Sequence, residues 1–97
     1  MAFDLQETIL PVDEISSKQD GFEIFPNPSD GAFYINGSSD ILDINIVNGI
    51  GQSVSSSSCN IFGKKAELSL QGYLPGMYFV EIVTDEVNST WLRLILY

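Results

Sequence analysis

The chain has 97 residues, enough for about one domain, and its 44% apolar and 18% charged residues exclude an intrinsically disordered polypeptide. Thirteen acidic and four basic side chains give a formal net charge of −9, which disfavours nucleic acid and anionic membrane surfaces as partners. Because the sequence has no histidine and only one cysteine, Cys59, it excludes histidine-dependent catalysis, histidine-ligated zinc and an internal disulfide.

Residues 1–21 are acidic and rich in turn-forming residues, and their apolar residues follow no steady period. We interpret this segment as a linker or upstream tail with an extended piece at residues 8–12; a short edge strand there is the alternative. The segment lacks the basic and apolar stretches of a secretory signal peptide, so we expect either that an export signal is missing or that the chain is the tail of a longer protein.

From Phe22 onward, short runs of alternating apolar and polar residues are separated by turn-forming residues. The predicted strands are residues 22–25, 32–35, 41–48, 52–55, 66–70, 77–84 and 90–97. In the third of them, Leu42, Ile44 and Ile46 are expected to face the core. No segment has a helical period, and no apolar run is long enough for a membrane-spanning helix.

This pattern predicts an all-β domain over residues 22–97, an Ig-like antiparallel β-sandwich of about seven strands with a Greek-key connection. The run at residues 77–84 is apolar on both faces, with Tyr78, Val80 and Ile82 opposite Met77, Phe79 and Val83. We expect the two packed sheets to cover both of these faces.

A turn followed by a tyrosine stands before the longest predicted strand, in Leu74-Pro75-Gly76-Met77-Tyr78. Pro75 and Gly76 suit the two central positions of a type II turn, the second of which needs a positive φ. Tyr78 resembles a tyrosine corner, whose hydroxyl binds the backbone a few residues upstream and fixes a Greek-key crossing. The competing interpretation is a ligand platform made of Tyr73 and Tyr78.

The acidic residues Asp30, Asp40 and Asp43 lie near predicted turns, where carboxylates could gather around Ca²⁺. No Asp-x-Asp-x-Asp-Gly loop occurs, so we interpret these residues as a solvated acidic surface. A pair of catalytic carboxylates would need a cleft, which a module of this size rarely provides. We therefore expect no catalytic residue, no metal site and no cofactor.

The last predicted strand has two different faces. Trp91, Arg93 and Tyr97 alternate with Leu92, Leu94 and Leu96. If the first set is exposed, it forms an aromatic and cationic patch suited to a sugar or a protein; if it is covered, Trp91 belongs to the core.

Three segments resemble, in order and in spacing, the type A C-terminal sorting domain of the type IX (Por) secretion system. Residues 22–31 resemble its "YPNP…G" opening, residues 44–54 its "vxvyNxxGqxV" segment, and residues 68–80 its "idlsxLpxGvYxv" segment. The sorting-motif and turn residues that they carry are Pro26, Asn27, Pro28, Gly31, Asn48, Gly51, Leu74, Gly76 and Tyr78.

The resemblance implies a non-catalytic secretion signal of Bacteroidetes-type bacteria that folds as an Ig-like sandwich. Such a domain directs an upstream cargo in the same chain across the outer membrane, where the translocon reads it and a sortase removes it. The cleavage region would correspond to residues 12–21. The implied localisation is the periplasm in transit and then the cell surface or the extracellular space.

We expect the strand within residues 88–97 to be the recognition element, pairing or docking edge-on with a receptor. Its candidate residues are Trp91, Arg93, Leu94, Ile95, Leu96 and Tyr97. The alternative function is an accessory carbohydrate-binding or adhesion sandwich that uses Trp91, Tyr34 and Tyr73, and an Ig-like spacer is a third interpretation.

Overall fold

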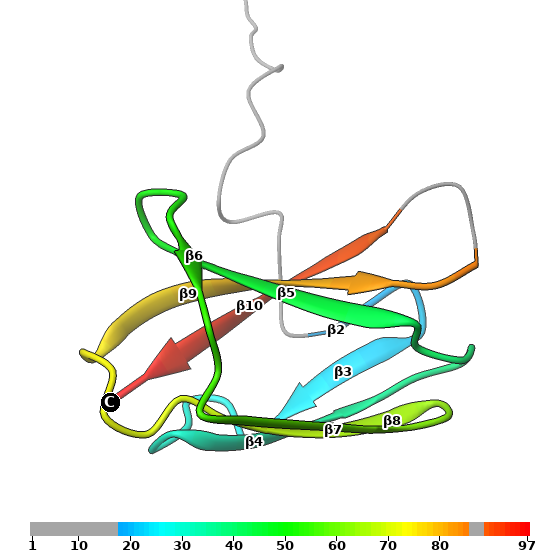
Figure 1. The fold of residues 1–97 in the computed structure, drawn as a ribbon, viewed down its shortest axis with the longest axis horizontal. Coiled ribbons are helices and arrows are strands. Elements are labelled where there is room, and N and C mark those ends of the chain that lie inside the picture. The colour runs from blue at the N-terminus through cyan, green and yellow to red at the C-terminus, as the bar shows by residue number, and fades with distance from the viewer. Residues whose placement is uncertain (1–17, 86–88) are drawn as a thin grey trace, which may run out of the picture.

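The computed structural model describes residues 18–85 and 89–97, and within them the chain forms two antiparallel sheets and no helix (Figure 1). One sheet has the order β10-β9-β5-β6, with β5 at Asp43–Asn48, β6 at Ser53–Val54, β9 at Gly76–Val83 and β10 at Thr90–Leu96. The other has the order β2-β3-β4-β8-β7, with β2 at Lys18–Gln19, β3 at Phe22–Phe25, β4 at Ala32–Asn36, β7 at Ser58–Phe62 and β8 at Lys65–Ser69. This described part contains no helix that could cross a membrane.

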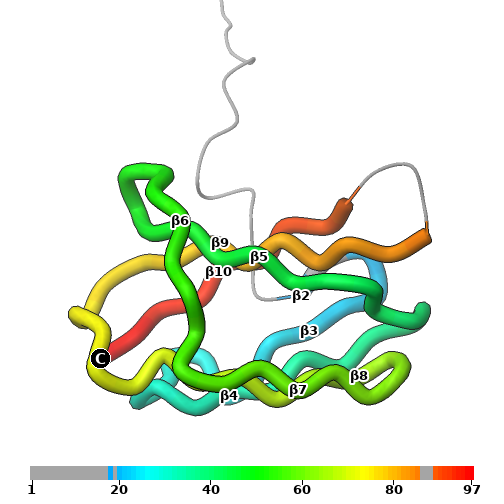
Figure 2. The backbone as a smooth tube through the Cα atoms, viewed as in Figure 1, coloured from blue at the N-terminus to red at the C-terminus, as the bar shows by residue number. Residues whose placement is uncertain are grey.

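The strand order is that of an immunoglobulin domain. Strands β3, β4, β8 and β7 take the places of strands A, B, E and D, and β10, β9, β5 and β6 take those of G, F, C and C′. The chain changes sheet between β4 and β5, between β6 and β7, and between β8 and β9, as the tube in Figure 2 shows. The predicted Ig-like sandwich is therefore confirmed.

All seven predicted strands are present, and two further strands occur where none was predicted. β2 lies in the predicted linker and pairs with β3. β7 forms a hairpin with β8, in a region where no strand was predicted. Every side chain of β7 is exposed. Its sequence therefore lacks the alternation of apolar and polar residues by which a half-buried strand is recognised. The predicted extended piece at residues 8–12 lies outside the described residues.

The third predicted strand starts later than expected. Leu42 is 61% exposed, whereas Ile41 is buried. Ile41, and not Leu42, therefore reaches the core. Ile41 and Leu42 precede β5, and their N–H groups donate to the carbonyls of Gly63 and Val83 at 2.8 and 2.7 Å. The regular alternation therefore begins only at Asp43.

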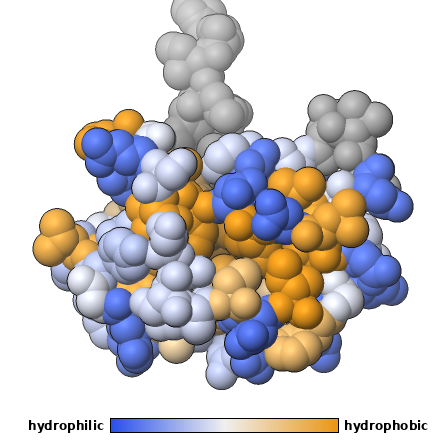
Figure 3. Space-filling model, in the orientation of Figure 1, coloured by the Kyte–Doolittle hydropathy of each residue, from blue (hydrophilic) through white to orange (hydrophobic). Residues whose placement is uncertain are grey.

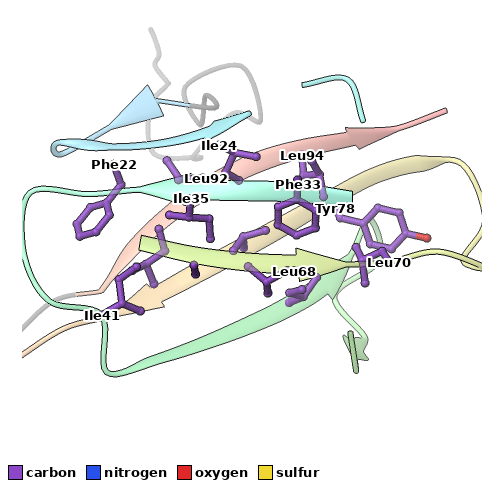
Figure 4. Close-up of a cluster of buried hydrophobic side chains, with 14 of the residues drawn as sticks. Phe22, Ile24, Phe33, Ile35, Ile41, Leu68, Leu70, Tyr78, Leu92 and Leu94 are labelled. Carbon is purple, nitrogen blue, oxygen red and sulfur yellow. The ribbon is translucent and has the colours of Figure 1, made fainter. Parts of the chain in front are cut away.

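Side chains from both sheets fill the space between the two layers (Figure 4). Phe33 and Ile35 of β4 and Leu92 and Leu94 of β10 are at most 1% exposed. The complete buried apolar cluster is Phe22, Ile24, Phe33, Ile35, Ile41, Ile46, Ala66, Leu68, Leu70, Tyr78, Val80, Ile82, Leu92, Leu94 and Leu96.

The outer face of β9 is not covered by a second layer. Tyr78, Val80 and Ile82 are buried, but Met77 is 36% exposed and Phe79 is only half-buried. The expectation that two sheets would cover both faces is wrong, because a sandwich covers only the inner face of each sheet.

The sandwich is open beside β7. Cys59 and Ile61 pair with Leu68 and Ala66, which are buried, so they lie on the inner face of their sheet, yet both are exposed. The strand at the corresponding edge of the other sheet, β6, has two residues and covers little of this face. Figure 3 shows hydrophobic surface on this side of the molecule, between the two layers.

Candidate functional site

The turn between β3 and β4 closes the outer edge of the last strand. The Asn27 side chain donates from Nδ2 to the Arg93 carbonyl at 2.8 Å and accepts at Oδ1 from the Ile95 N–H at 3.0 Å. The Ser29 N–H donates to the Ile95 carbonyl at 2.8 Å, and the Ser29 carbonyl accepts from the Tyr97 N–H at 3.0 Å. We call Asn27 and Ser29 the edge clamp, because these four bonds use backbone groups on the outer edge of β10.

The sequence of this turn explains why it keeps its shape. Pro26 and Pro28 fix their φ angles and have no N–H that would need a partner, and the peptide bonds before both are cis. Ser29 is 0% exposed, and its hydroxyl accepts from the Gly31 N–H at 3.0 Å and donates to the Ala32 carbonyl at 2.6 Å. The Ser29 backbone is thereby held where it meets β10.

Gly31 connects the turn to the loop after β8. Its φ is +135°, and a Cβ atom there would lie 2.8 Å from Cγ of Gln71. Its carbonyl accepts from the Leu70 N–H at 2.7 Å. Only glycine meets both the backbone angle and the close approach.

Asn48 organises the turn between β5 and β6. Its Oδ1 accepts from the N–H groups of Ile50 at 3.1 Å and Gln52 at 2.9 Å, and its Nδ2 donates to Oε1 of Gln52 at 3.1 Å. Gly51 has a φ of +88°, which a residue with a side chain rarely adopts. Because β9 and β5 separate β10 from β6, this turn lies apart from the edge clamp.

Tyr78 forms the predicted tyrosine corner. Its ring is 6% exposed, and its hydroxyl donates to the Leu74 carbonyl at 2.7 Å at the start of β9, the strand in the F position. The platform of Tyr73 and Tyr78 is wrong, because Tyr78 is buried and the Tyr73 hydroxyl donates to the Ser55 carbonyl.

The predicted type II turn is also wrong. Gly76 has a positive φ, as predicted, but its value of +147° is far from the roughly +80° of that turn type. Gly76 is already the first residue of β9 and pairs with Leu96, at a φ that residues with a side chain rarely adopt.

The candidate residues on β10 divide into two groups. Leu94 and Leu96 are 0% and 4% exposed and belong to the core, whereas Trp91 and Arg93 are half-buried and Ile95 and Tyr97 are 36% and 74% exposed. Edge-on pairing along residues 93–97 does not fit the structure, because the edge clamp already holds those backbone groups.

The outer face of β10 continues onto β9. Trp91 pairs with Glu81, Arg93 with Phe79 and Ile95 with Met77, all on the side away from the core. We call Trp91, Arg93, Ile95, Met77 and Phe79 the β9–β10 patch. It is an apolar strip with one cation, and Trp91 is neither core nor fully exposed.

The aromatic residues of the alternative function do not share a surface. Trp91 lies on the outer face of the four-stranded sheet, and Tyr34 lies on the outer face of the other sheet. Tyr73 lies in the loop between β8 and β9. These three rings therefore form no single row.

The acidic residues form no metal site in the described part. Within residues 18–85 and 89–97, no three His, Cys, Asp or Glu side chains gather where they could hold a metal ion. The pKa of the Cys59 thiol is raised above its ordinary value, first by partial burial and second by the negative charge of Asp43.

Sequence reasoning missed Ser29, which is the most buried polar residue of the turn. The available signal was a serine after Pro-Asn-Pro and two residues before a glycine, where a hydroxyl can bind nearby backbone groups.

Comparison with protein families gives a match over most of the chain. A family model described as "Secretion system C-terminal sorting domain" matches residues 23–96, about three quarters of the chain. The comparisons with curated proteins and with solved structures give no match. The matched residues contain the clamp residues Asn27 and Ser29, the Asn48 turn, the tyrosine corner and all of β10.

Proposed function

The chain belongs to the family of secretion system C-terminal sorting domains, a type IX secretion signal, and on this premise we propose that it acts as a non-catalytic address that is read as a folded body. Domains of this kind interact with the type IX machinery and lead to export to the cell surface or the extracellular space. We propose that an upstream cargo passes through the periplasm and that the outer-membrane translocon then reads this domain.

The observation that carries the proposal is the arrangement of the last strand. The edge clamp occupies the backbone groups of residues 93–97, and the leucines of β10 are buried. From Arg93 to Tyr97, a receptor can therefore contact this strand through its outward side chains rather than by edge-on pairing. The β9–β10 patch and Tyr97 supply exposed aromatic and aliphatic area together with the guanidinium of Arg93, a composition typical of protein interfaces.

We propose that a sortase cuts before Lys18. The expected cleavage region extends over residues 12–21, but Lys18 and Gln19 form β2 and pair with Glu23 and Phe22. A protease binds its substrate as an extended chain, so a cut within β2 would first require this pairing to open. A cut before Lys18 would separate the cargo without breaking any strand pair of the described sandwich.

The test is export of a reporter protein fused in front of the complete 97-residue chain, in a host with a type IX system. Ile95→Glu places a charge on the β9–β10 patch at a position that is 36% exposed. We expect the reporter to remain in the cell. Ile50→Glu is the matched control, since Ile50 is 80% exposed in the turn between β5 and β6, and we expect normal export.

A substitution on the outer face is a sharper test than removal of the tail. Deleting residues 94–97 also removes Leu94 and Leu96 from the core, so lost export would report unfolding as well as lost recognition. Normal export of an Ile95→Glu fusion whose domain is folded, judged by its resistance to protease, would refute recognition through the β9–β10 patch.

A further inference from the structure

Three aromatic side chains gather on the outer face of the five-stranded sheet. Phe25, Tyr34 and Phe62 are 42%, 44% and 58% exposed. Phe25 and Tyr34 are directly opposite each other on β3 and β4, and their rings stack with centroids 5.6 Å apart and planes inclined by 30°. Exposed aromatic rings that cluster in this way are more typical of binding surfaces than of the rest of a protein surface.

A groove of about 290 Å³ crosses this face and is lined by Phe25, Tyr34, Asn36, Phe62, Lys65 and Glu67. Its size is near the lower end of the range for small-molecule sites, roughly 300–1,000 Å³. Tyr34 pairs with Glu67 across β4 and β8, and Lys65 pairs with both Asn36 and Phe62. The rings of Tyr34 and Phe62 therefore each have a charged side chain opposite them on β8.

We propose that this groove binds a neutral saccharide. One face of a pyranose ring carries C–H groups, which pack on the electron-rich faces of aromatic rings such as Phe25 and Tyr34. The hydroxyls at the rim of the sugar both donate and accept hydrogen bonds. The carboxamide of Asn36, the ammonium of Lys65 and the carboxylate of Glu67 supply the complementary groups around the groove.

The charge of the molecule selects a neutral ligand. The groove carries one cation and one anion, Lys65 and Glu67, while the whole chain carries a formal charge of −9 and repels polyanions.

The sheet also disfavours a peptide as the occupant. Strands β4 and β8, which form the centre of the floor of the groove, each have a neighbouring strand on both sides. Their backbone groups are used within the sheet, so a peptide could not add to them as a further strand.

This site lies on the sheet opposite β10 (Figure 1) and shares no residue with the β9–β10 patch, so its test does not depend on the export proposal. Of the three aromatic residues expected to bind carbohydrate, only Tyr34 lines the groove. Phe25 and Phe62, which were not candidates, complete it.

The test is a titration of the complete, ¹⁵N-labelled chain with cellohexaose, chitohexaose and mannohexaose, followed by amide chemical shifts. We expect at least one of them to shift resonances of β3, β4 and β8. Tyr34→Ala should then weaken binding about fivefold, since a lost ring contact costs about 1 kcal/mol, whereas Tyr34→Phe, which keeps the ring, should bind within about twofold of the original chain. Ile50→Ala truncates an exposed side chain in the turn of the other sheet and should bind normally.

Four outcomes would overturn the proposal. They are no shift with any of the three sugars at millimolar concentration, shifts confined to the four-stranded sheet, unchanged binding by Tyr34→Ala together with Phe62→Ala, and tighter binding of an anionic oligogalacturonate than of the neutral sugars.

Discussion

The side chain of Asn27 accepts a hydrogen bond from the N–H of Ile95 across 68 positions of the chain. The same carboxamide donates to the Arg93 carbonyl, so one residue of the turn after the first long strand satisfies two backbone groups on the edge of the last. An exposed edge strand is normally a site for unwanted pairing, and here a side chain closes that edge.

We expect Asn27→Asp to lower the free energy of unfolding by about 1–3 kcal/mol, because two hydrogen bonds are involved and each is worth about 0.5–1.5 kcal/mol. Aspartate keeps the shape, but it has no donor and turns a negative oxygen towards the Arg93 carbonyl. Urea unfolding measures the change, and the Ile95 amide should exchange its hydrogen faster. Asn60→Asp makes the same charge change at an exposed position. Equal stability of the two variants would contradict the role of the clamp.

Ser29→Ala should cost about 1–3 kcal/mol, the range for leaving a buried polar group without its partner. The hydroxyl of Ser29 serves the Gly31 N–H and the Ala32 carbonyl in a place with no exposed surface. Thermal and urea unfolding check this expectation. Ser58→Ala, at an exposed position on β7, should leave the stability unchanged, and a similar result for Ser29→Ala would show that the hydroxyl is dispensable.

Tyr78→Phe should lower stability by about 0.5–1.5 kcal/mol, the net value of one hydrogen bond, because only the bond to the Leu74 carbonyl is lost and the ring still fills its place. Tyr97→Phe is the control, since that ring is 74% exposed. An unchanged urea midpoint for Tyr78→Phe would reject the tyrosine corner as a stabilising contact.

The raised pKa of Cys59 predicts slow alkylation near neutral pH. Partial burial and the charge of Asp43 both favour the neutral thiol, so less of the reactive thiolate is present at about pH 8 than in a free cysteine. Asp43→Asn removes the negative charge but keeps an oxygen for the Ile44 N–H, and it should speed up the reaction with iodoacetamide at that pH. The two rates should converge well above the pKa of the thiol, and identical rates at about pH 8 would exclude an influence of Asp43.

Strands with one buried face could be predicted from the sequence because burial imposes a period of two. β3 and β10 alternate between buried and exposed residues over their full length, and both were predicted within one residue of their bounds. β7 was missed because both of its faces are exposed. β7 forms because it pairs with β8, and no pattern in the residues of β7 indicates that pairing.

The candidate site could be predicted only in part, for a related reason. The residues 26–31 show their turn chemistry locally, since two prolines, a serine and a glycine favour particular backbone angles. The partner of Asn27 is set by the topology, which brings β3 beside β10 from opposite ends of the chain. A local sequence pattern cannot predict such a long-range contact. The groove could not be predicted for the same reason, because its aromatic rings come from β3, β4 and β7.

The edge clamp also bears on the order in which the domain folds. β10 is the last strand in the sequence, and both β9 and the residues Asn27 and Ser29 depend on it for their hydrogen-bond partners. Until residues 90–97 are in place, β9 lacks its partner strand on one side, and Asn27 and Ser29 lack the backbone groups that they bind. Contacts between residues this far apart in the sequence form more slowly than local contacts, so the clamp closes late in folding.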